Sequence, residues 1–392
     1  MKILSVFGTR PEAVKMAPIV RLLAKTDGIE SYVCVTAQHR QMLDQVLELF
    51  QIKPNYDLDL MRDNQSLSEL SAAIFTNLDR VLTEVQPDWV LVQGDTTTVA
   101  ITALLSYYRR IKVGHVEAGL RTHDKWQPFP EEINRRVAGV AADMHFAPTE
   151  LSRKNLLREN TPDEMIVVTG NPVIDALKYV AEQEEPDEIK ELLAKLEIVS
   201  PALRLHPAPP PFGHDVSTKG NKRLILVTAH RRENFGQPIE NICHALKELA
   251  SRGDVEIVYP VHLNPNVQEP VKRILKGIEG ITLLPPLDYL PLVHLMKRST
   301  LILTDSGGIQ EEAPSFGIPV LVLRETTERP EGVDAGTLKL VGTDTSRIVQ
   351  EAKRLLDDES EYAKMAKASN PYGDGHAAER IVEALLRTSP SA

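Results

Sequence analysis

Residues 89–116 of the chain read WVLVQGDTTTVAITALLSYYRRIKVGHV, and the fold prediction rests on the pattern they contain. A short apolar run, Trp89–Gln93, leads through polar residues into a helical pattern at Thr97–Arg109 and then a second apolar run at Lys112–Val116. Unbroken apolar runs are typical of strands in a parallel sheet that helices cover on both faces. The stretch therefore predicts a strand–helix–strand unit.

The same alternation runs through the rest of the chain in two series. In the first series we expect further strands at Ile3–Phe7, Ser31–Thr36, Met144–Ala147 and Met165–Val168. Further helices are expected there at Pro11–Lys25, Arg40–Phe50, Ser66–Val85, Glu131–Ala141 and Thr149–Arg158. In the second series the expected strands are Leu224–Ala229, Val255–Val261, Ile281–Leu284, Leu301–Thr304, Pro319–Leu323 and Thr337–Val341. The expected helices are Pro238–Arg252, Pro265–Lys276, Leu290–Lys297, Gly308–Phe316, Ser346–Leu356, Glu359–Lys367 and, after the break NPYGDG, Ala377–Leu386. This alternation predicts an α/β protein with doubly wound, Rossmann-like parallel sheets.

A break in the pattern separates the two series. Residues 182–221 hold one short helical piece, Ile189–Leu196, and then clustered Pro, Gly, Ser and Lys, which is typical of a linker or surface insertion. We therefore expect a first domain at 1–181, a linker at 182–221 and a second domain at 222–370. Two such domains that face each other would form a cleft at the carboxyl ends of their strands.

Composition and charge narrow the possible functions. Of the 392 residues, 45 are Lys or Arg and 55 are Asp or Glu, which gives a formal net charge of −10. A general binder of nucleic acid or of an anionic membrane needs a basic face, so we expect neither as a partner, although a local basic pocket for one anion remains compatible. No apolar stretch approaches the length of a membrane span, and the start MKILSVFGTRPEA lacks the pattern of a secretory signal. We expect a cytoplasmic protein.

The cysteines agree with that expectation. Cys34 and Cys243 lie far apart in the sequence, each within an apolar pattern. Buried free thiols in a reducing compartment are the simplest interpretation. No Cys/His cluster has the spacing of a zinc site, so no metal is expected.

The segment GTRPEAVK, Gly8–Lys15, follows the first expected strand. A glycine turn that leads into a helix presents free N–H groups and a partial positive charge, which suit a phosphate or a carboxylate, and Arg10 and Lys15 add full charges. The structural alternative is a tight turn with a solvated arginine. Neither the Walker pattern nor GxGxxG is present, so the sequence supports neither the phosphate-binding loop of an NTPase nor a dinucleotide site.

Three acids follow strands or begin helices in the first half. Asp95 lies in QGDTTT, Glu117 in GHVEAGLRT, and Glu131 in PFPEEINRR. Each has a structural alternative, because Asp95 could cap a helix, Glu117 could be a solvated loop acid, and Glu131 could be a first-turn acid favoured by the helix dipole. Crowded carboxylates raise one another's pKa, so that one donates a proton while another accepts one. Together the acids predict proton transfer onto and off carbon or a leaving group.

Polar residues after strands in the second half suit a nucleotide. His230, in TAHRRENFG, follows a strand and precedes two arginines. In DSGGIQEE, residues 306–308 open a helix, so their backbone N–H groups can hold a diphosphate. Glu312 in that helix suits a ribose diol, and Arg329 lies close to the same segment.

Taken together, the motifs resemble those of the non-hydrolysing UDP-N-acetylglucosamine 2-epimerases. They include VFGTRPEAVKMAP, GDTTT, VGHVEAGLRT, PFPEEINRR, TAHRREN, YPVHLNP, LTDSGGIQEEAPSFGIPV and NPYGDG, in that order. The resemblance covers nearly the whole chain except the region near 182–221. It implies a GT-B architecture, with two Rossmann-like domains, an active site between them and a last helix, about 376–390, that packs back on the first domain.

The resemblance also implies a reaction. UDP-N-acetylglucosamine would be converted reversibly to UDP-N-acetylmannosamine by elimination of UDP to a 2-acetamidoglucal intermediate and re-addition, in supply of cell-surface polysaccharides. No cofactor is implied, because the oxidation level of the sugar does not change. Family members are commonly homodimers.

Residue roles follow by the same resemblance. It implies catalytic roles for Asp95, Glu117, Glu131 and His230. It implies binding of the UDP substrate by Arg10, Lys15, Ser306, Gly307, Gly308, Glu312 and Arg329. Which acid serves which face of C2 stays open.

Some family members carry a second, activating UDP-N-acetylglucosamine site. The residues that match it are Gln38, Gln41, Glu131, Arg231 and His262. Asn64 stands where an arginine is expected, which counts against activation, and Gln93 stands where a histidine is common. Leu287 and Leu292 replace a glutamine and a phenylalanine that lie near the uracil in some members.

Three other functions fit the same motifs. A hydrolysing 2-epimerase would release free N-acetylmannosamine and UDP. A GT-B glycosyltransferase would turn over only with an acceptor, and a nucleotide-sugar sensor would bind the compound without converting it.

Overall fold

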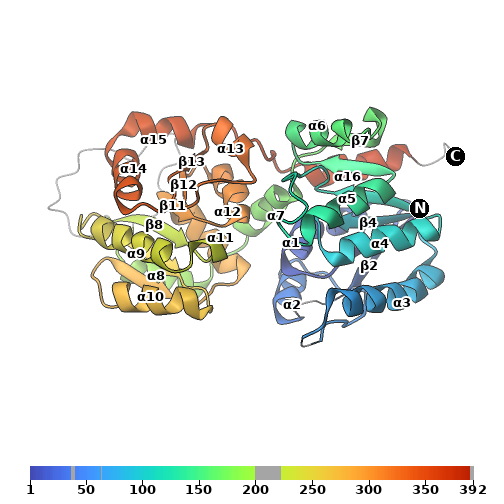
Figure 1. Cartoon of the computed structure of the whole chain (residues 1–392), viewed down its shortest axis with the longest axis horizontal. Coiled ribbons are helices and arrows are strands. Elements are labelled where there is room, and N and C mark those ends of the chain that lie inside the picture. The colour runs from blue at the N-terminus through green and yellow to red at the C-terminus, as the bar shows by residue number, and fades with distance from the viewer. Residues whose placement is uncertain (37–39, 63, 199–221, 389–392) are drawn as a thin grey trace. The chain divides into compact units, whose positions relative to one another are not determined.

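The computed structural model describes residues 1–36, 40–62, 64–198 and 222–388, and the chain divides into two compact units (Figure 1). The first unit is Met1–Lys178 together with Tyr372–Ala392, and the second is Tyr179–Pro371. Residues 199–221 of the predicted linker lie outside the described residues. Its described part contains the helix α8 (Asp187–Lys195), which belongs to the second unit.

The first unit is built on a seven-stranded parallel sheet with the order β3-β2-β1-β4-β5-β6-β7. The strands are β1 (Lys2–Phe7), β2 (Glu30–Val35), β3 (Tyr56–Asp57), β4 (Trp89–Gln93), β5 (Lys112–Val116), β6 (Met144–Ala147) and β7 (Ile166–Val168). The helices are α1 (Arg10–Leu23), α2 (Arg40–Leu49), α3 (Leu67–Val85), α4 (Thr97–Tyr108), α5 (Glu131–Ala141), α6 (Glu150–Arg158), α7 (Pro172–Ala181, on which the boundary between units falls) and α16 (Ala377–Arg387). The sequence did not predict β3 or α7. A strand as short as β3 carries no periodic signal.

The second unit has a six-stranded parallel sheet with the order β10-β9-β8-β11-β12-β13. The strands are β8 (Arg223–Thr228), β9 (Val255–Pro260), β10 (Ile281–Leu284), β11 (Leu301–Thr304), β12 (Val320–Val322) and β13 (Leu338–Leu340). The helices besides α8 are α9 (Gln237–Ala250), α10 (Pro265–Leu275), α11 (Tyr289–Arg298), α12 (Gly307–Glu312), α13 (Pro330–Asp334), α14 (Thr345–Asp357) and α15 (Glu359–Ala366). The predicted helix Gly308–Phe316 is in fact α12 followed by a 3₁₀ turn, because Pro314 has no N–H to continue the α-helical bonds. The predicted α/β fold with two parallel sheets is confirmed.

Strand order reverses once in each sheet. The chain first adds strands on one side of β1, then crosses over to place β4 on its other side, and β8 and β11 are related in the same way. In doubly wound sheets, the carboxyl ends of the strands at such a reversal are where ligands bind. The loops after these four strands are therefore the first place to look for a site.

The core explains why these segments became strands. Residues of β1 and β4 such as Leu4, Val6 and Val90 are fully buried between helices on both faces of the sheet. Cys34 and Cys243 are buried free thiols, as predicted, and burial raises the pKa of both to about 12. In the described ranges, no helix is both long and apolar enough to cross a membrane.

The last helix returns to the first unit. Helix α16 packs against α1, although the two segments lie at opposite ends of the sequence (Figure 1). Asp175 of α7 accepts hydrogen bonds from the backbone N–H groups of Ala377 and Ala378, at 3.2 and 2.9 Å. These bonds satisfy two N–H groups at the start of α16, which fixes where the helix begins.

Two buried histidines lie side by side in the first sheet. His115 of β5 pairs in register with His145 of β6, and each is 1% exposed. His115 Nε2 lies 2.7 Å from the Gly94 carbonyl oxygen, whereas the Nδ1 atoms of both rings have no hydrogen-bond partner within the described part of the chain. Burial lowers the pKa of His115 to about 4 and that of His145 to about 3. The folded protein therefore keeps both rings neutral where an unfolded chain would protonate them.

We expect the free energy of unfolding to fall as the pH drops below about 6.5, the pKa of an unfolded histidine. The contribution is fully present above that pH and is lost progressively toward pH 4, at about 2 kcal/mol per buried histidine between pH 7 and pH 5. Urea unfolding at both pH values measures it. His145→Phe should remove about half of the decline, whereas His244→Gln, at an exposed position, should leave it unchanged. An equal decline in all three proteins would contradict the prediction.

Candidate active site

In the first unit, one buried carboxylate ties together the two loops at the strand reversal. Glu12 accepts hydrogen bonds from the backbone N–H groups of Gly8 and Thr9 after β1, at 2.8 and 2.7 Å. It also accepts one from the Thr96 hydroxyl after β4, at 2.5 Å. Thr9 in turn caps α1, and Pro11 stands in the first turn, where its missing N–H costs nothing. Burial raises the pKa of Glu12 despite these bonds.

In the second unit, a different buried acid joins the two loops at the strand reversal. Asp305, which directly follows β11, is fully buried, and its Oδ2 accepts from the backbone N–H groups of His230 and Arg231 after β8, each at 2.8 Å. The side-chain amide of Asn234 donates to the same oxygen at 2.9 Å. In both units, then, a side chain that faces inward fixes the two loops expected to contact a ligand.

Glu117 has an unusual backbone and several donors. It follows β5 with φ at +63°, a left-handed conformation that costs a non-glycine residue energy and that clusters at functional sites. Its carboxylate is buried and forms an ion pair with Lys15 of α1. The side-chain amides of Gln93 and Asn171 also donate to it, Asn171 at 3.0 Å. Because three separate elements hold it, this carboxylate is fixed in one orientation.

Asp95 lies in the loop after β4 and is bound by an arginine of α5. Arg135 donates from Nε and Nη2 to Asp95 Oδ2, at 3.2 and 2.5 Å. The helix cap at the start of α4 is Thr96, so the predicted alternative in which Asp95 caps that helix is wrong. Asp95 and Glu117 are therefore each balanced by their own cation, a feature that sequence reasoning did not include.

Glu131 and its neighbour have different surroundings at the start of α5. Glu131 Oε2 is buried, and no described residue forms a hydrogen bond with it. Glu132 is fully buried and accepts from the backbone N–H groups of Thr122 and His123, at 3.1 and 3.2 Å. Burial opposes ionisation of Glu132, but these bonds and those from neighbouring arginines outweigh it, so its pKa is lowered. Glu132 is a structural acid, whereas Glu131 retains an unused oxygen.

The two expected phosphate cations of the first unit differ. Lys15 is committed to Glu117 and is only 14% exposed. Arg10, at the start of α1, forms no ion pair with any residue that the structure describes. Of the two, Arg10 is the cation with its charge uncompensated.

His230 lies against a second histidine in the second unit. Its Nδ1 is 3.6 Å from Asp305 Oδ1, and its ring stacks on that of His262 with centroids 5.3 Å apart and planes 12° apart. His262 and Arg231 were assigned by resemblance to the activating site. The structure therefore brings two residues of that set into the immediate surroundings of His230.

The predicted nucleotide-binding residues of the second unit lie around α12. Ser306 is its N-cap, and a Cβ atom added at Gly308 would meet nothing within 4 Å. A Cβ added at Gly307 would lie 2.8 Å from the Arg329 guanidinium carbon, so a glycine lets this cation approach the helix start. Arg329 is also held by Glu311 at 2.9 Å, and Glu312 accepts from the Tyr289 hydroxyl at 3.1 Å. These contacts fix a cation beside the start of α12 and a carboxylate at its last residue.

Part of the predicted activating site cannot be compared. Gln38 lies outside the described residues, and Gln41 lies in α2 with a side chain that the structure does not describe. Asn64, which stands in place of the expected arginine, has φ at +56°, a conformation that asparagine tolerates better than most residues.

Comparison with known proteins places these residues in one family. A family model described as UDP-N-acetylglucosamine 2-epimerase matches residues 21–386. The UDP-N-acetylglucosamine 2-epimerase of Escherichia coli (strain K12) is 56% identical over 388 residues, which are 98% of each protein. That of Salmonella typhimurium is 57% identical over 386 residues, again 98% of each. The chain belongs to the UDP-N-acetylglucosamine 2-epimerase family.

Solved structures of the 2-epimerase family have the same fold. The crystal structure of the Neisseria meningitidis UDP-GlcNAc 2-epimerase bound to UDP-GlcNAc is 49% identical, covers 99% of this chain and all of its own, and has a TM-score of 0.85. The Methanocaldococcus jannaschii enzyme in complex with UDP-GlcNAc and UDP is 32% identical over 99% of this chain, with a TM-score of 0.77. The resemblance inferred from the motifs, and the GT-B fold it implied, are confirmed.

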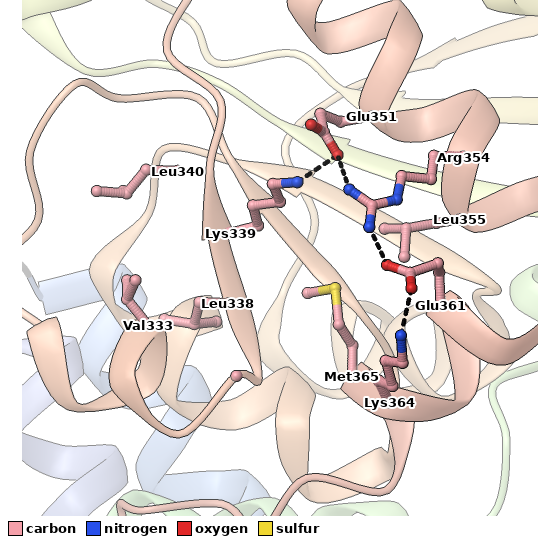
Figure 2. A pocket seen from close by; sticks show the side chains of 11 residues that line it. Val333, Leu338, Lys339, Leu340, Glu351, Arg354, Leu355, Glu361, Lys364 and Met365 are labelled. Carbon is pink, nitrogen blue, oxygen red and sulfur yellow. Dashed lines mark hydrogen bonds and ion pairs between the residues drawn. The ribbon is translucent and has the colours of Figure 1, made fainter.

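The second unit of this 2-epimerase family member also contains a pocket whose charged side chains are already paired with one another. It has a volume of about 450 Å³ and lies among β13, α14 and α15 (Figure 2). Its charged side chains pair with one another: Glu351 with Lys339 at 2.5 Å and with Arg354 at 3.9 Å, and Glu361 with Lys364 at 2.5 Å and with Arg354. The apolar lining consists of Val333, Leu338, Leu340, Leu355 and Met365. None of the predicted site residues lines it.

Sequence reasoning missed several residues that hold the site together. Asn171 and Gln93 bind Glu117, Arg135 binds Asp95, and Tyr289 binds Glu312. Asn171 lies in the stretch TGNPVIDAL, residues 169–177, and nothing in the spacing of that stretch points to Glu117. The one signal that could have found these residues is that an acid after a strand needs a donor from a neighbouring loop. That signal can be used only once the strand order is known.

Proposed function

We propose that the chain catalyses the reversible epimerisation of UDP-N-acetylglucosamine to UDP-N-acetylmannosamine at C2. The observation that carries the proposal is Glu117, a buried carboxylate in a left-handed backbone conformation, bound by Lys15, Gln93 and Asn171. An acid fixed in this way suits proton transfer at carbon, which needs accurate placement of the base or acid. Family membership supplies the substrate.

The reaction proceeds in two balanced stages. In the first, an enzyme carboxylate takes the proton from C2, the C1–O bond to the β-phosphate breaks, and a C1–C2 double bond forms as UDP leaves. In the second, UDP adds back to C1 while an enzyme acid protonates C2 from the opposite face. No electrons are gained or lost overall, so no redox cofactor is required.

Each residue's proposed task follows from its position and contacts within its own unit. Asp95, Glu117 and Glu131 of the first unit are the proposed proton-transfer groups, since each has a carboxylate at a strand end or helix start. His230 of the second unit is proposed to stabilise the departing phosphate, because Asp305 holds its loop and lies 3.6 Å from its ring. The residues around α12, with Arg10, are proposed to bind UDP, since cations and free N–H groups suit a diphosphate.

The test is a proton NMR time course of UDP-N-acetylglucosamine in deuterated water with the purified chain. We expect UDP-N-acetylmannosamine to appear, and we expect the C2 proton signal to be lost as solvent deuterium enters. Free N-acetylmannosamine in stoichiometric amount would instead support the hydrolysing reaction. Absence of any conversion, with or without added substrate as activator, would contradict the proposal.

We further propose that the active form is a homodimer. Tyr107 and Tyr108 at the end of α4 are 65% and 63% exposed, and Val140 at the end of the adjacent α5 is 92% exposed. Phe75 of α3 stacks on Tyr108 with centroids 6.3 Å apart, so the apolar surface is continuous between α3 and α4. A patch of this kind is typical of an interface. Light scattering should give twice the chain mass of 43.6 kDa, and a monomer would contradict this proposal.

The two buried free thiols support a cytoplasmic location, where cysteines stay reduced. Recovery of the protein in the cytoplasmic fraction of lysed cells would test this.

A further inference from the structure

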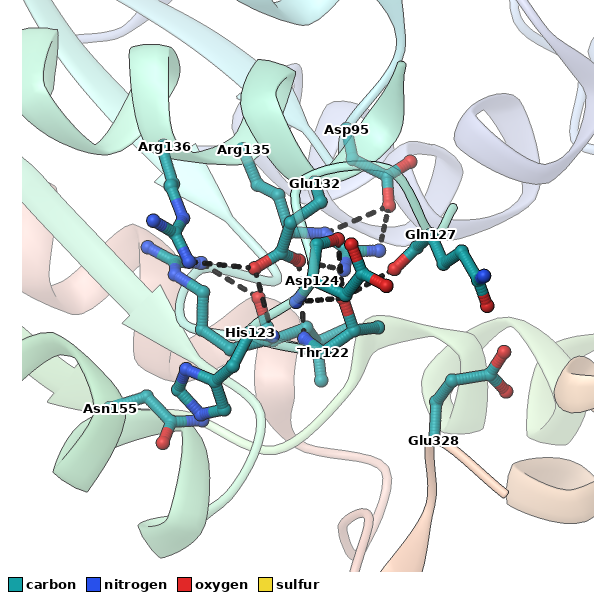
Figure 3. A network of polar contacts seen from close by, with 12 residues as sticks. Asp95, Thr122, His123, Asp124, Gln127, Glu132, Arg135, Arg136, Asn155 and Glu328 are labelled. Carbon is teal, nitrogen blue, oxygen red and sulfur yellow. Dashed lines mark hydrogen bonds and ion pairs between the residues drawn. The ribbon is translucent and has the colours of Figure 1, made fainter. Parts of the chain in front are cut away.

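Arg135 stands between two carboxylates that belong to different parts of the first unit (Figure 3). On one side, two of its nitrogens donate to the same oxygen of Asp95, at 3.2 and 2.5 Å. On the other side, Nη1 donates to Glu132 Oε2 at 2.9 Å. A planar guanidinium presents its N–H groups to the two carboxylates in a fixed fork, whereas an ammonium group offers a single nitrogen on a flexible stem.

Glu132 extends the contact to the loop that follows Glu117. Its two oxygens accept the backbone N–H groups of Thr122 and His123, at 3.1 and 3.2 Å (Figure 3). Arg135 therefore links the loop after β4, which carries Asp95, to the loop after β5, which starts at Glu117. Loss of this link would free two candidate catalytic carboxylates from each other.

Arg135 also places a positive charge between the two carboxylates. Arg135 is 11% exposed, and although burial by itself would lower its pKa, the carboxylates of Asp95 and Glu132 raise it. The side chain is accordingly a permanent cation in a largely dry setting. Both bonds from Arg135 to Asp95 go to Oδ2, which leaves Oδ1 without a bond from Arg135.

We propose that Arg135 is a positioning residue for the epimerisation, which holds Asp95 in register with the Glu117 loop and leaves one Asp95 oxygen free of Arg135. This inference rests on the proposed function and deepens it, because it assigns Asp95 to the proton-accepting stage of the reaction. Arg135 itself takes no part in proton transfer.

Arg136 offers a matched control on the same helix. It carries the same charge and also contacts Glu132, at 3.2 Å, but it is 40% exposed and makes no contact with Asp95. A change at Arg136 removes one positive charge and one Glu132 contact. It leaves the contact between Arg135 and Asp95 intact.

The experiment compares R135Q, R135K and R136Q with the wild-type chain in the conversion assay and in UDP binding. For R135Q we expect kcat to fall by about 100-fold or more, because Asp95 and the Glu117 loop lose the side chain that holds them in register. UDP affinity should stay within about three-fold, since the proposed diphosphate-binding residues are unchanged. R136Q should keep kcat within about three-fold.

R135K keeps the inference testable if R135Q does not fold. A lysine retains the charge but has one donor nitrogen on a flexible stem in place of the fixed fork of a guanidinium, so it should hold Asp95 and Glu132 less accurately. We therefore expect a kcat about ten-fold below that of the wild type, which is higher than that of R135Q, with UDP affinity again within about three-fold.

Three outcomes would overturn the inference. They are equal losses of kcat in R135Q and R136Q, a loss of UDP affinity in R135Q as large as its loss of kcat, and an R135K as active as the wild type. A wild-type chain that converts no substrate would instead overturn the proposed function, and the inference with it. The two failures are thus distinguished within one assay.

Discussion

Replacing Glu117 by glutamine is expected to lower kcat by about 1,000-fold or more, while UDP affinity changes by less than about three-fold. Glutamine has nearly the shape of glutamate but cannot take or return a proton at C2. The side chain is buried and faces Lys15, Gln93 and Asn171, so solvent cannot easily replace the missing group. Initial rates of conversion and the rate of deuterium entry at C2 measure the effect.

Two further measurements make this result interpretable. Glu117→Gln leaves the Lys15 ammonium without its anion, so thermal unfolding must show that the variant still folds. Glu159→Gln is the control, because Glu159 is an exposed acid that is likewise bound by a cation, Arg121, at 2.8 Å. It should keep kcat within about three-fold. A Glu117→Gln protein that exchanges the C2 proton within ten-fold of the wild-type rate would remove Glu117 from the mechanism.

Replacing Gly119 by alanine is expected to destabilise the fold by about 3 kcal/mol or more, or to prevent folding. Gly119 has φ at +91°, and an added Cβ would lie 2.3 Å from the backbone oxygen of Ser152 in α6. A backbone atom in a helix cannot turn aside as a long side chain can. The loop is also tied to α6 by a bond of 3.0 Å from Asn155 to the Gly119 carbonyl oxygen.

The consequence reaches the active site, because Gly119 lies two residues after Glu117. Any Gly119→Ala protein that folds should also lose activity, since α6 and the Glu117 loop must move apart. Urea unfolding measures the stability. Gly28→Ala provides the control, because Gly28 also has positive φ, at +79°, but has nothing within 4 Å of an added Cβ, so we expect a loss of only about 1 kcal/mol. Equal losses in both variants would show that backbone conformation, and not the contact with Ser152, determines the cost.

Local pattern predicted the regular elements well and the short ones poorly. Strands such as Trp89–Gln93, Lys112–Val116 and Met144–Ala147 have their predicted bounds, since a mostly apolar run between polar residues marks both ends. Strand β3 pairs only Tyr56 and Asp57 with β2, and no window of sequence that short distinguishes a strand from a loop. Strand β3 forms because β2 lies beside it and pairs with it.

The sequence by itself determined that two parallel sheets form and which polar residues follow their strands. Both follow from spacing along the chain, because side chains repeat every two residues in a strand and every 3.6 in a helix. Asp95, Glu117 and His230 could therefore be selected, together with the glycines that open α12.

Only the tertiary structure decided what holds those residues. The partners Lys15 and Glu117 are 102 positions apart, Arg135 and Asp95 are 40 apart, and His230 and Asp305 are 75 apart. Each pair meets because β4 lies beside both β1 and β5, or because β11 lies beside β8. Strand order depends on the packing of the whole sheet and leaves no periodic trace in the sequence. The same is true of the left-handed conformation of Glu117, which the surrounding contacts hold in place and the residue alone would not adopt.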